Sequence, residues 1–154
     1  MKESYGHRPY RMKRGVDILV SLSALIVFAP VIAVLCIAVR CDSAGCPIYS
    51  QERLGQHKRR FMMYKLRTMV DDAEQGVPML TVPDDRRITG IGRWLRKFRV
   101  DELPQLWNVL RGDMSLVGPR PEREYYFNLI ENEEPSCRRV LDVKPGLTSL
   151  GLIR

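Results

Sequence analysis

The stretch Ile18–Val39 reads ILVSLSALIVFAPVIAVLCIAV and has no charged residue in its 22 positions. As a straight helix it would be about 33 Å long, enough to cross a bilayer core of about 30 Å. A buried core helix is the plain alternative, but a chain of 154 residues holds one modest domain, too small to surround this run. A signal peptide is disfavoured by the length of the run and the lack of a cleavage site. The sequence therefore predicts a membrane helix.

Two features of this run favour a helix that enters the membrane and returns on the same side. Five basic residues stand on each flank, so the charge asymmetry that sets the orientation of a spanning helix is missing. Pro30 lies near the middle and removes a helix hydrogen bond, which predicts a kink. The two arms would be about 18 and about 14 Å long, each reaching roughly halfway through the hydrocarbon. A kinked helix that spans the bilayer is the alternative.

The remainder of the chain is polar and basic, with a formal net charge of +7. This balance indicates an anionic partner such as nucleic acid, anionic lipid or a phosphorylated substrate. The aromatic residues do not alternate with basic ones as in an RNA-binding sheet, so we expect no nucleic acid. The four cysteines form neither a CxxC pair nor a zinc pattern with the two histidines, which predicts free thiols in a reducing compartment.

Short apolar-polar alternation predicts two strands, Pro47–Leu54 and Phe61–Met69, joined by a loop at Gly55–Arg60. Lys65 and Arg67 would share one face of the second strand, because side chains alternate with period two. Two cations placed together suit a phosphate. From spacing alone, a solvated strand face is the favoured explanation.

Two helices are predicted next, over Thr89–Phe98 and Asp101–Leu110. Pro104 suits the first turn of the second helix, and Gly112 is expected to end it. The expected apolar stripes are Ile91, Trp94, Leu95 and Phe98 in the first helix, and Leu103, Leu106, Trp107 and Leu110 in the second.

Asp101 and Glu102 lie side by side within Arg86–Arg123, a span with nine Lys or Arg and four acids. Capping of a helix N-terminus is the plain explanation, and it is favoured when no family is considered. Phosphoryl transfer is the functional one. A carboxylate such as Asp101 can attack a phosphate if cations hold the phosphate oxygens. Mg²⁺ takes one or two carboxylates plus substrate phosphates, which suits Glu102.

Two proline turns follow. In GPRP, Gly118–Pro121, the prolines fix φ and present Arg120 on a stiff backbone, where a guanidinium suits a phosphate or a nucleotide base. A plain proline-rich turn is about equally favoured. KPG, Lys144–Gly146, predicts a type II turn with Gly146 at its third position.

Together these segments resemble the bacterial sugar transferase family, the monotopic phosphoglycosyl transferases. The resemblance runs in order along nearly the whole chain. It is carried by KRGVDILVSLSALIVFAP (13–30), PIYSQERLGQHKRRFMMYKLRTM (47–69), DDRRITGIGRWLRKFRVDELPQLWNVLRGDMSLVGPRPE (84–122) and VKPGLTSLG (143–151).

The resemblance implies a mainly helical α+β fold in two parts. Residues 1–40 would form a basic segment and a re-entrant membrane helix kinked at Pro30, packed on a small cytoplasmic α/β catalytic domain with short strands, residues 41–154. Family members lie on the cytoplasmic face of the bacterial inner membrane, with both flanks of the helix cytoplasmic. They move a sugar 1-phosphate from a UDP-sugar to undecaprenyl phosphate, which initiates capsule, exopolysaccharide, O-antigen or glycoprotein glycan assembly.

The resemblance also implies roles for individual residues. Asp101 would be the nucleophile, forming a covalent phosphosugar-aspartate and releasing UMP before the lipid phosphate attacks. Glu102, the second expected catalytic residue, would bind the Mg²⁺ cofactor. Arg96 would hold phosphate and Arg120 would lie at the nucleotide. The full set of expected substrate-binding side chains is Lys65, Arg67, Arg96 and Arg120.

The chain departs from the family pattern at two places. Ala29 stands where the family has Ser before the kinking proline, and Ala cannot hydrogen-bond backbone carbonyls near the break. Relatives are also expected to continue for some tens of residues beyond Arg154. A catalytically inactive or truncated membrane-surface scaffold is therefore the alternative function, and a homodimer is left open.

Overall fold

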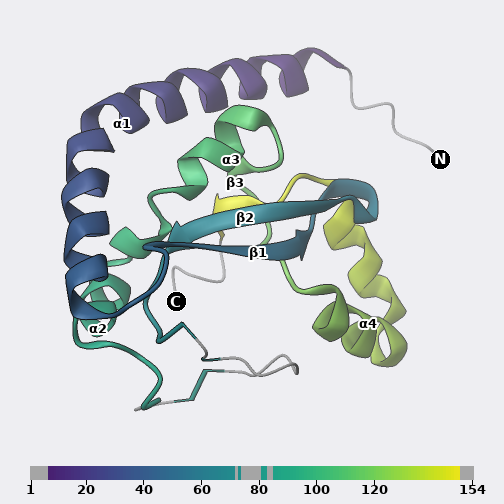
Figure 1. Cartoon of the computed structure of the whole chain (residues 1–154). Helices are drawn as coiled ribbons and strands as arrows, with labels where there is room; N and C mark the ends of the chain where they lie inside the picture. The colour runs from purple at the N-terminus through teal and green to yellow at the C-terminus, as the bar shows by residue number, and fades with distance from the viewer. Residues whose placement is uncertain (1–6, 72, 74–80, 83–84, 150–154) are drawn as a thin grey trace.

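The computed structural model describes residues 7–71, 73, 81–82 and 85–149. Figure 1 shows one long helix that runs along two sides of a smaller body of short helices and strands. The described part is a mainly helical α+β protein, as predicted, with small sheets. The ends of the two predicted segments, residues 1–6 and 150–154, lie outside the described residues. The elements are α1 (His7–Asp42), β1 (Ile48–Leu54), η1 (Gln56–Lys58), β2 (Arg60–Leu66), α2 (Gly90–Phe98), η2 (Val100–Glu102), α3 (Gln105–Arg111), β3 (Ser115–Val117), α4 (Glu124–Glu133), η3 (Pro135–Asp142) and β4 (Gly146–Thr148).

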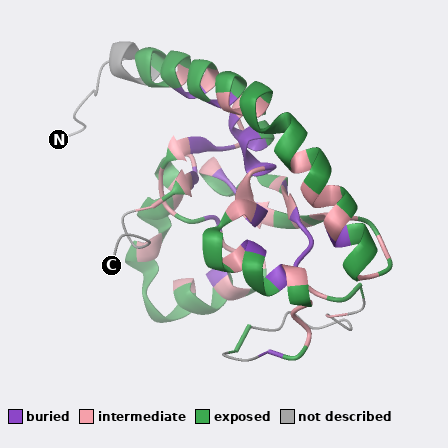
Figure 2. Cartoon of the chain, turned by 90° about the vertical axis from the view of Figure 1, so that its left-hand side faces the viewer, coloured by how far each residue is buried: buried purple, intermediate pink, exposed green. Residues whose placement is uncertain are grey.

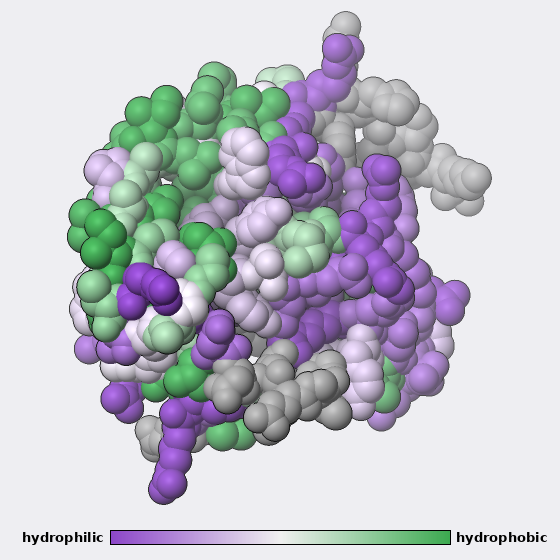
Figure 3. Space-filling model, viewed as in Figure 1, coloured by the Kyte–Doolittle hydropathy of each residue, from purple (hydrophilic) through white to green (hydrophobic). Residues whose placement is uncertain are grey.

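The apolar run lies in α1, a continuous helix of 36 residues that contains Pro30. It is long and apolar enough to cross a membrane, and only 6% of its most apolar window is buried inside the protein. Figures 2 and 3 show this helix exposed along most of its length and apolar side chains gathered over it. The helix is therefore not the core of a soluble domain, which suggests membrane association.

The first flank of α1 is fixed to the polar body by two charged side chains. Arg14 donates hydrogen bonds to the carbonyl oxygens of Val109 and Leu110, at 2.6 and 2.7 Å, near the end of α3. The buried Asp17 carboxylate accepts from the Ser115 hydroxyl at 2.8 Å and from the Leu116 backbone N–H at 3.1 Å. The hydrogen bonds of Arg14 and Asp17 are together called the first clamp below.

The second flank of α1 is fixed to the same body. Asp42 accepts a hydrogen bond from the backbone N–H of Ile91 at 3.1 Å, at the start of α2. Arg67 donates to the carbonyl oxygens of Ser43 and Ala44 at 2.7 and 2.5 Å, just beyond the helix. These contacts form the second clamp. Figure 1 shows α1 bent between the region beside α3 and the region beside α2.

The predicted hairpin is confirmed with small shifts in its bounds. β1 and β2 pair antiparallel, with Ile48 opposite Leu66 and Leu54 opposite Arg60. Because β2 ends at Leu66, Arg67 lies beyond the strand. The expectation that Lys65 and Arg67 share one strand face is therefore wrong.

The predicted helix over Thr89–Phe98 is confirmed as α2, with the Thr89 hydroxyl accepting from the Gly92 N–H at 3.0 Å. The second prediction needs correction, because Pro104 separates a short helix, η2, from α3. Gly112 ends α3 as expected, with a left-handed φ of 93°. The predicted apolar stripes of the two helices were partly wrong, because Trp94, Phe98 and Trp107 are exposed. The buried residues of α3 are Gln105, Leu106, Asn108 and Val109.

A second, parallel sheet was not predicted. It pairs β3 with β4, and it brings Gly118 and Gly146 into close contact. A Cβ on Gly146 would lie 2.1 Å from the Gly118 nitrogen, so no larger residue fits there. Gly146 begins a strand rather than occupying the third position of a type II turn, so that prediction is wrong.

Most of the buried apolar residues in the described part of the chain form two small clusters. One joins α1, β2 and α2 through Val39, Leu66 and Leu95. The other joins β2 to α3 and the segment after it through Met63, Val109 and Met114. β2 contributes Leu66 to one cluster and Met63 to the other, so the strand is anchored to both.

Candidate active site

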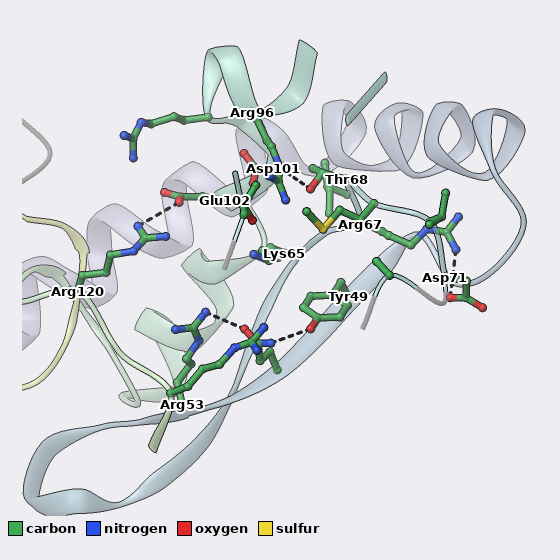
Figure 4. Close-up of a pocket in the computed structure, with 18 of the residues that line it drawn as sticks. Tyr49, Arg53, Lys65, Arg67, Thr68, Asp71, Arg96, Asp101, Glu102 and Arg120 are labelled. Carbon is green, nitrogen blue, oxygen red and sulfur yellow. Dashed lines mark hydrogen bonds and ion pairs between the residues drawn. The ribbon is translucent and has the colours of Figure 1, made fainter. Parts of the chain in front are cut away.

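A pocket of about 650 Å³ opens where the hairpin, α2, η2 and the GPRP turn meet (Figure 4). Basic side chains outnumber acidic ones among the lining residues. The basic ones are Arg53, Lys65, Arg67, Arg96, Arg99, Arg120 and Arg123, and the acidic ones are Asp71, Asp101, Glu102 and Glu122. The pocket therefore suits a ligand with several negative charges.

Asp101 lies in η2, directly after the tight bend at Arg99, whose φ is 54°. It is only 8% exposed. Burial, together with the neighbouring Glu102 charge, raises the pKa of its carboxyl group, while Lys65 and Arg96 act in the opposite direction. Both acids lie in the first turn of η2, where negative charge suits the helix dipole, as the plain explanation expected. Neither η2 nor α3 has a side-chain cap hydrogen bond, so the N-cap part of that explanation is wrong.

Lys65 projects from β2 beside Asp101 (Figure 4). Burial and the nearby positive charges of Arg53, Arg96 and Arg120 lower the pKa of its ammonium group to about 8, although Asp101 raises it. Its Nζ also lies 5.6 Å from the centre of the Tyr49 ring. Lys65 is thus a cation held at the centre of the pocket by packing.

Arg96 reaches the pocket because α2 docks closely on the chain after β2. A Cβ on Gly92 would lie 2.1 Å from the Thr68 carbonyl oxygen, so the glycine permits this approach. Arg96 then donates from Nε to the Thr68 hydroxyl at 2.8 Å. This bond fixes the guanidinium on the Asp101 side of the pocket.

Arg120 is presented by a turn that both sheets hold. The Gly146 N–H donates to the Pro119 carbonyl at 2.8 Å, and the Leu54 N–H donates to the Glu122 carbonyl at 2.9 Å. The Arg120 guanidinium lies 3.6 Å from the Glu102 carboxylate. The turn thereby connects the predicted nucleotide residue with the acid pair.

Arg67 lines the pocket, but its guanidinium is used elsewhere. Its Nη atoms are bonded to Ser43 and Ala44, and Figure 4 shows the side chain directed toward Asp71 rather than Lys65. The structure therefore brings five of the six predicted side chains together, namely Lys65, Arg96, Asp101, Glu102 and Arg120. It places the sixth in the second clamp.

Sequence reasoning missed the polar face of β1. Tyr49, Gln51 and Arg53 all line the pocket, because they alternate along one strand. The same period-two argument that was applied to Lys65 would have placed these three side chains together. Arg99 and Arg123 were missed as well, and basic residues are too common in this chain for composition to single them out.

Glu102 could contribute to a magnesium site. Its side chain is 18% exposed and faces the pocket beside Asp101. Within the described part of the chain, no cluster of three or more His, Cys, Asp or Glu residues forms a complete metal site. Mg²⁺ is commonly held by one or two carboxylates plus substrate phosphates, so this donor set fits an ion shared with a phosphorylated ligand.

A buried carboxylate among cations, beside an exposed apolar helix, suggests a membrane-associated protein whose pocket suits an anionic ligand. The family model for bacterial sugar transferases matches residues 8–154, so the chain belongs to the bacterial sugar transferase family.

Three relatives illustrate the similarity. A Bacillus subtilis (strain 168) protein named "Putative undecaprenyl-phosphate N-acetylgalactosaminyl 1-phosphate transferase" is 45% identical over 80% of this chain and 69% of its own length. An Aeromonas hydrophila UDP-N-acetylgalactosamine-undecaprenyl-phosphate N-acetylgalactosaminephosphotransferase is 38% identical over 89% of this chain. A Salmonella typhimurium undecaprenyl-phosphate galactose phosphotransferase is 39% identical over 90%. The matched region is 32% of the length of each of the last two proteins.

Proposed function

We propose that this protein transfers a sugar 1-phosphate from a UDP-sugar to undecaprenyl phosphate and so initiates glycan assembly. The observation that carries the proposal is the buried Asp101 carboxylate, which faces Lys65 and Arg96 in a mainly cationic pocket. The names of the relatives supply the substrate classes.

In the first step, an Asp101 carboxylate oxygen attacks the phosphorus that bears the sugar. A new oxygen–phosphorus bond forms as the bond to the bridging oxygen of the diphosphate breaks, and that electron pair leaves with UMP. Two anions approach each other in this step, so the positive charges of Lys65 and Arg96 lower its barrier. The raised pKa of Asp101 also makes its ionised form a stronger nucleophile.

In the second step, a phosphate oxygen of undecaprenyl phosphate attacks the phosphorus of the phosphosugar-aspartate. The bond to Asp101 breaks, its electron pair returns to the carboxylate, and a polyprenyl diphosphate sugar is released. Glu102 would hold Mg²⁺, which when bound neutralises part of the phosphate charge. Arg120 lies where it can contact the nucleotide while remaining near Glu102.

The same proposal includes a re-entrant α1 on the cytoplasmic face of the bacterial inner membrane. Both clamps join the flanks of α1 to one polar body, which supports an entry and an exit on the same side of the bilayer. A straight helix of 36 residues would separate its ends by about 54 Å. We attribute the bend to Pro30, without need of a serine at position 29.

UMP release tests the reaction. Full-length protein in detergent is supplied with a panel of UDP-sugars, Mg²⁺ and undecaprenyl phosphate, alongside Asp101→Asn and the matched control Asp113→Asn. We expect release that needs Asp101 and Mg²⁺ but not Asp113, whose carboxylate lies outside the pocket lining. Membrane binding that salt reverses, with no UMP from any donor, would favour the scaffold alternative.

Thiol labelling tests the topology. Cys46 lies exposed after the second flank, and Met12 lies exposed on the first. One variant keeps only Cys46, and another carries only Met12→Cys. A membrane-impermeant reagent should label both from the cytoplasmic side of oriented vesicles. Labelling from opposite sides would show that α1 spans the bilayer.

A further inference from the structure

The polar face of β1 forms a chain of hydrogen bonds along one wall of the pocket. Gln51 donates to the Tyr49 hydroxyl at 2.8 Å and accepts from Arg53 Nη2 at 2.7 Å. Arg53 in turn donates from Nη1 to the Pro121 carbonyl at 3.2 Å. This chain of bonds connects the hairpin with the turn that carries Arg120, and Arg53 lies at the junction.

Arg53 has hydrogen-bonding capacity that the described protein does not use. Its side chain is 12% exposed, and its buried Nε has no hydrogen-bond partner among the described residues. The Glu122 carboxylate lies 3.6 Å from Nη1, too far for a good hydrogen bond. Arg67 Nε, in the second clamp, is also buried without a partner, so an unbonded Nε alone does not identify a ligand site. Arg53 is set apart because its guanidinium lies in the pocket wall with Lys65 and Arg120, where a cation suits a phosphate.

The position of Arg53 relative to Asp101 indicates which ligand atom this is. Figure 4 shows Lys65 between Asp101 on one side and Arg53 on the other. Lys65, Asp101 and Arg53 all line the same pocket. A diphosphate whose middle lies at Lys65 would direct one phosphate toward Asp101 and the other toward Arg53.

We propose that Arg53 binds the phosphate that leaves with the nucleoside, on the far side of Lys65 from the nucleophile. This inference rests on the proposed function. When Asp101 attacks, the bond between the two phosphates breaks and its electron pair collects on the leaving phosphate. The Arg53 guanidinium, fixed by Gln51 and Pro121, stabilises that charge where it develops.

The test compares two ligands that differ by that phosphate. Binding of UMP and of uridine is measured by calorimetry or competition on the full chain in detergent, for wild type, Arg53→Gln and Arg53→Lys. Arg60→Gln is the matched charge control, because Arg60 is exposed on β2 outside the pocket lining. We expect Arg53→Gln to weaken UMP binding by about 10- to 100-fold and uridine binding by less than about twofold. Arg53→Lys should lie between, and Arg60→Gln should bind like wild type.

The other outcomes overturn the inference in distinguishable ways. Equal losses for UMP and uridine would mean that Arg53 only supports the Pro121 turn. No loss for either would remove it from the site. Wild-type protein that binds no UMP would overturn both this inference and the donor class of the proposed function. Phosphate-dependent binding without Asp101-dependent UMP release would preserve the role of Arg53 in phosphate binding and contradict the proposed reaction alone.

Discussion

Asp17 and Asp101 are both buried aspartates, but their surroundings differ. Asp17, at the first clamp, is 5% exposed and accepts hydrogen bonds from Ser115 and Leu116. Asp101, at the pocket, is 8% exposed, and the only hydrogen bond to its carboxylate within the described chain comes from its own backbone. The first carboxylate is satisfied by the fold, and the second is left available for a substrate.

The basic residues show the same contrast. Arg67 is nearly buried and gives its Nη atoms to carbonyl oxygens of the loop after α1, whereas the Arg53 guanidinium lies in the pocket wall with Lys65. The Nε atom of each arginine is buried without a hydrogen-bond partner among the described residues. Residue type and burial are therefore poor guides to function in this chain. The groups that each charged side chain contacts distinguish the clamps from the pocket.

The largest effect should come from removing the pocket carboxylate. We expect Asp101→Asn to lower UMP release by at least about 1000-fold, because the amide cannot act as the nucleophile. The folded protein should be no less stable. A carboxyl pKa that is raised on folding means that the ionised form is disfavoured, so stability is lost as pH rises through that pKa.

Radiolabelled UDP-sugar measures the covalent adduct, and thermal unfolding at pH 7 measures stability. Labelling retained in Asp101→Asn would assign the nucleophile elsewhere. A large drop in melting temperature would show that Asp101 supports the fold as Asp17 does.

The second effect is the reverse, a loss of stability at the first clamp. Asp17→Ala leaves the Ser115 hydroxyl and the Leu116 N–H without their acceptor, which should cost on the order of 3 kcal/mol. Asp113→Ala is the control, because Asp113 is more exposed and its ion pair with Arg111 spans 3.5 Å at the surface. Denaturant unfolding in a fixed detergent measures the free energy of unfolding of both variants. Similar losses for the two would show that the Asp17 contacts stabilise the protein no more than a surface ion pair does.

The sequence predicted the parts of this comparison that depend on local pattern. Alternation with period two predicted the hairpin, and helical periodicity with Thr89 predicted α2. The adjacent acids and several of the cations around them line one pocket. The apolar helix was evident from its composition alone. These features are encoded within a few residues of one another.

The missed features depend on contacts between distant segments. β3 and β4 are three residues each, and their pairing requires Gly118 and Gly146 to meet across the fold. Arg67 contacts the loop after α1 because β2 ends at Leu66 and the carbonyls of residues 43 and 44 lie within reach. The sequence pattern does not show these contacts, so it does not separate Arg67 from Arg53. The exposed faces of Trp94 and Phe98 also follow from how α2 docks, which helical periodicity does not report.

A third, intermediate effect is the pH dependence of donor use. Lys65 must be protonated to attract phosphate, and its pKa of about 8 means that the charge is lost as pH rises through 8. We therefore expect kcat/KM for the donor to fall about tenfold between pH 7 and pH 9, since this parameter reports the free enzyme. Lys65→Arg should abolish that fall, because a guanidinium stays charged. A fall of equal size in Lys65→Arg would assign the titration to another group.

The smallest effect should come from Arg67, which the sequence placed at the substrate and the structure places in the second clamp. Arg67→Lys retains the charge but cannot reproduce the forked contacts with Ser43 and Ala44, so we expect about 1 kcal/mol of lost stability. KM for the UDP-sugar should stay within about twofold of wild type, because the guanidinium is already engaged. Initial rates across donor concentrations measure KM, and thermal unfolding measures stability. Arg96→Lys is the pocket counterpart, for which KM should rise while stability changes less.

If Arg67→Lys instead raised KM at unchanged stability, its bonds to the loop would have to open during donor binding. Arg67 would then take part in donor binding, as the predicted set of substrate-binding side chains has it.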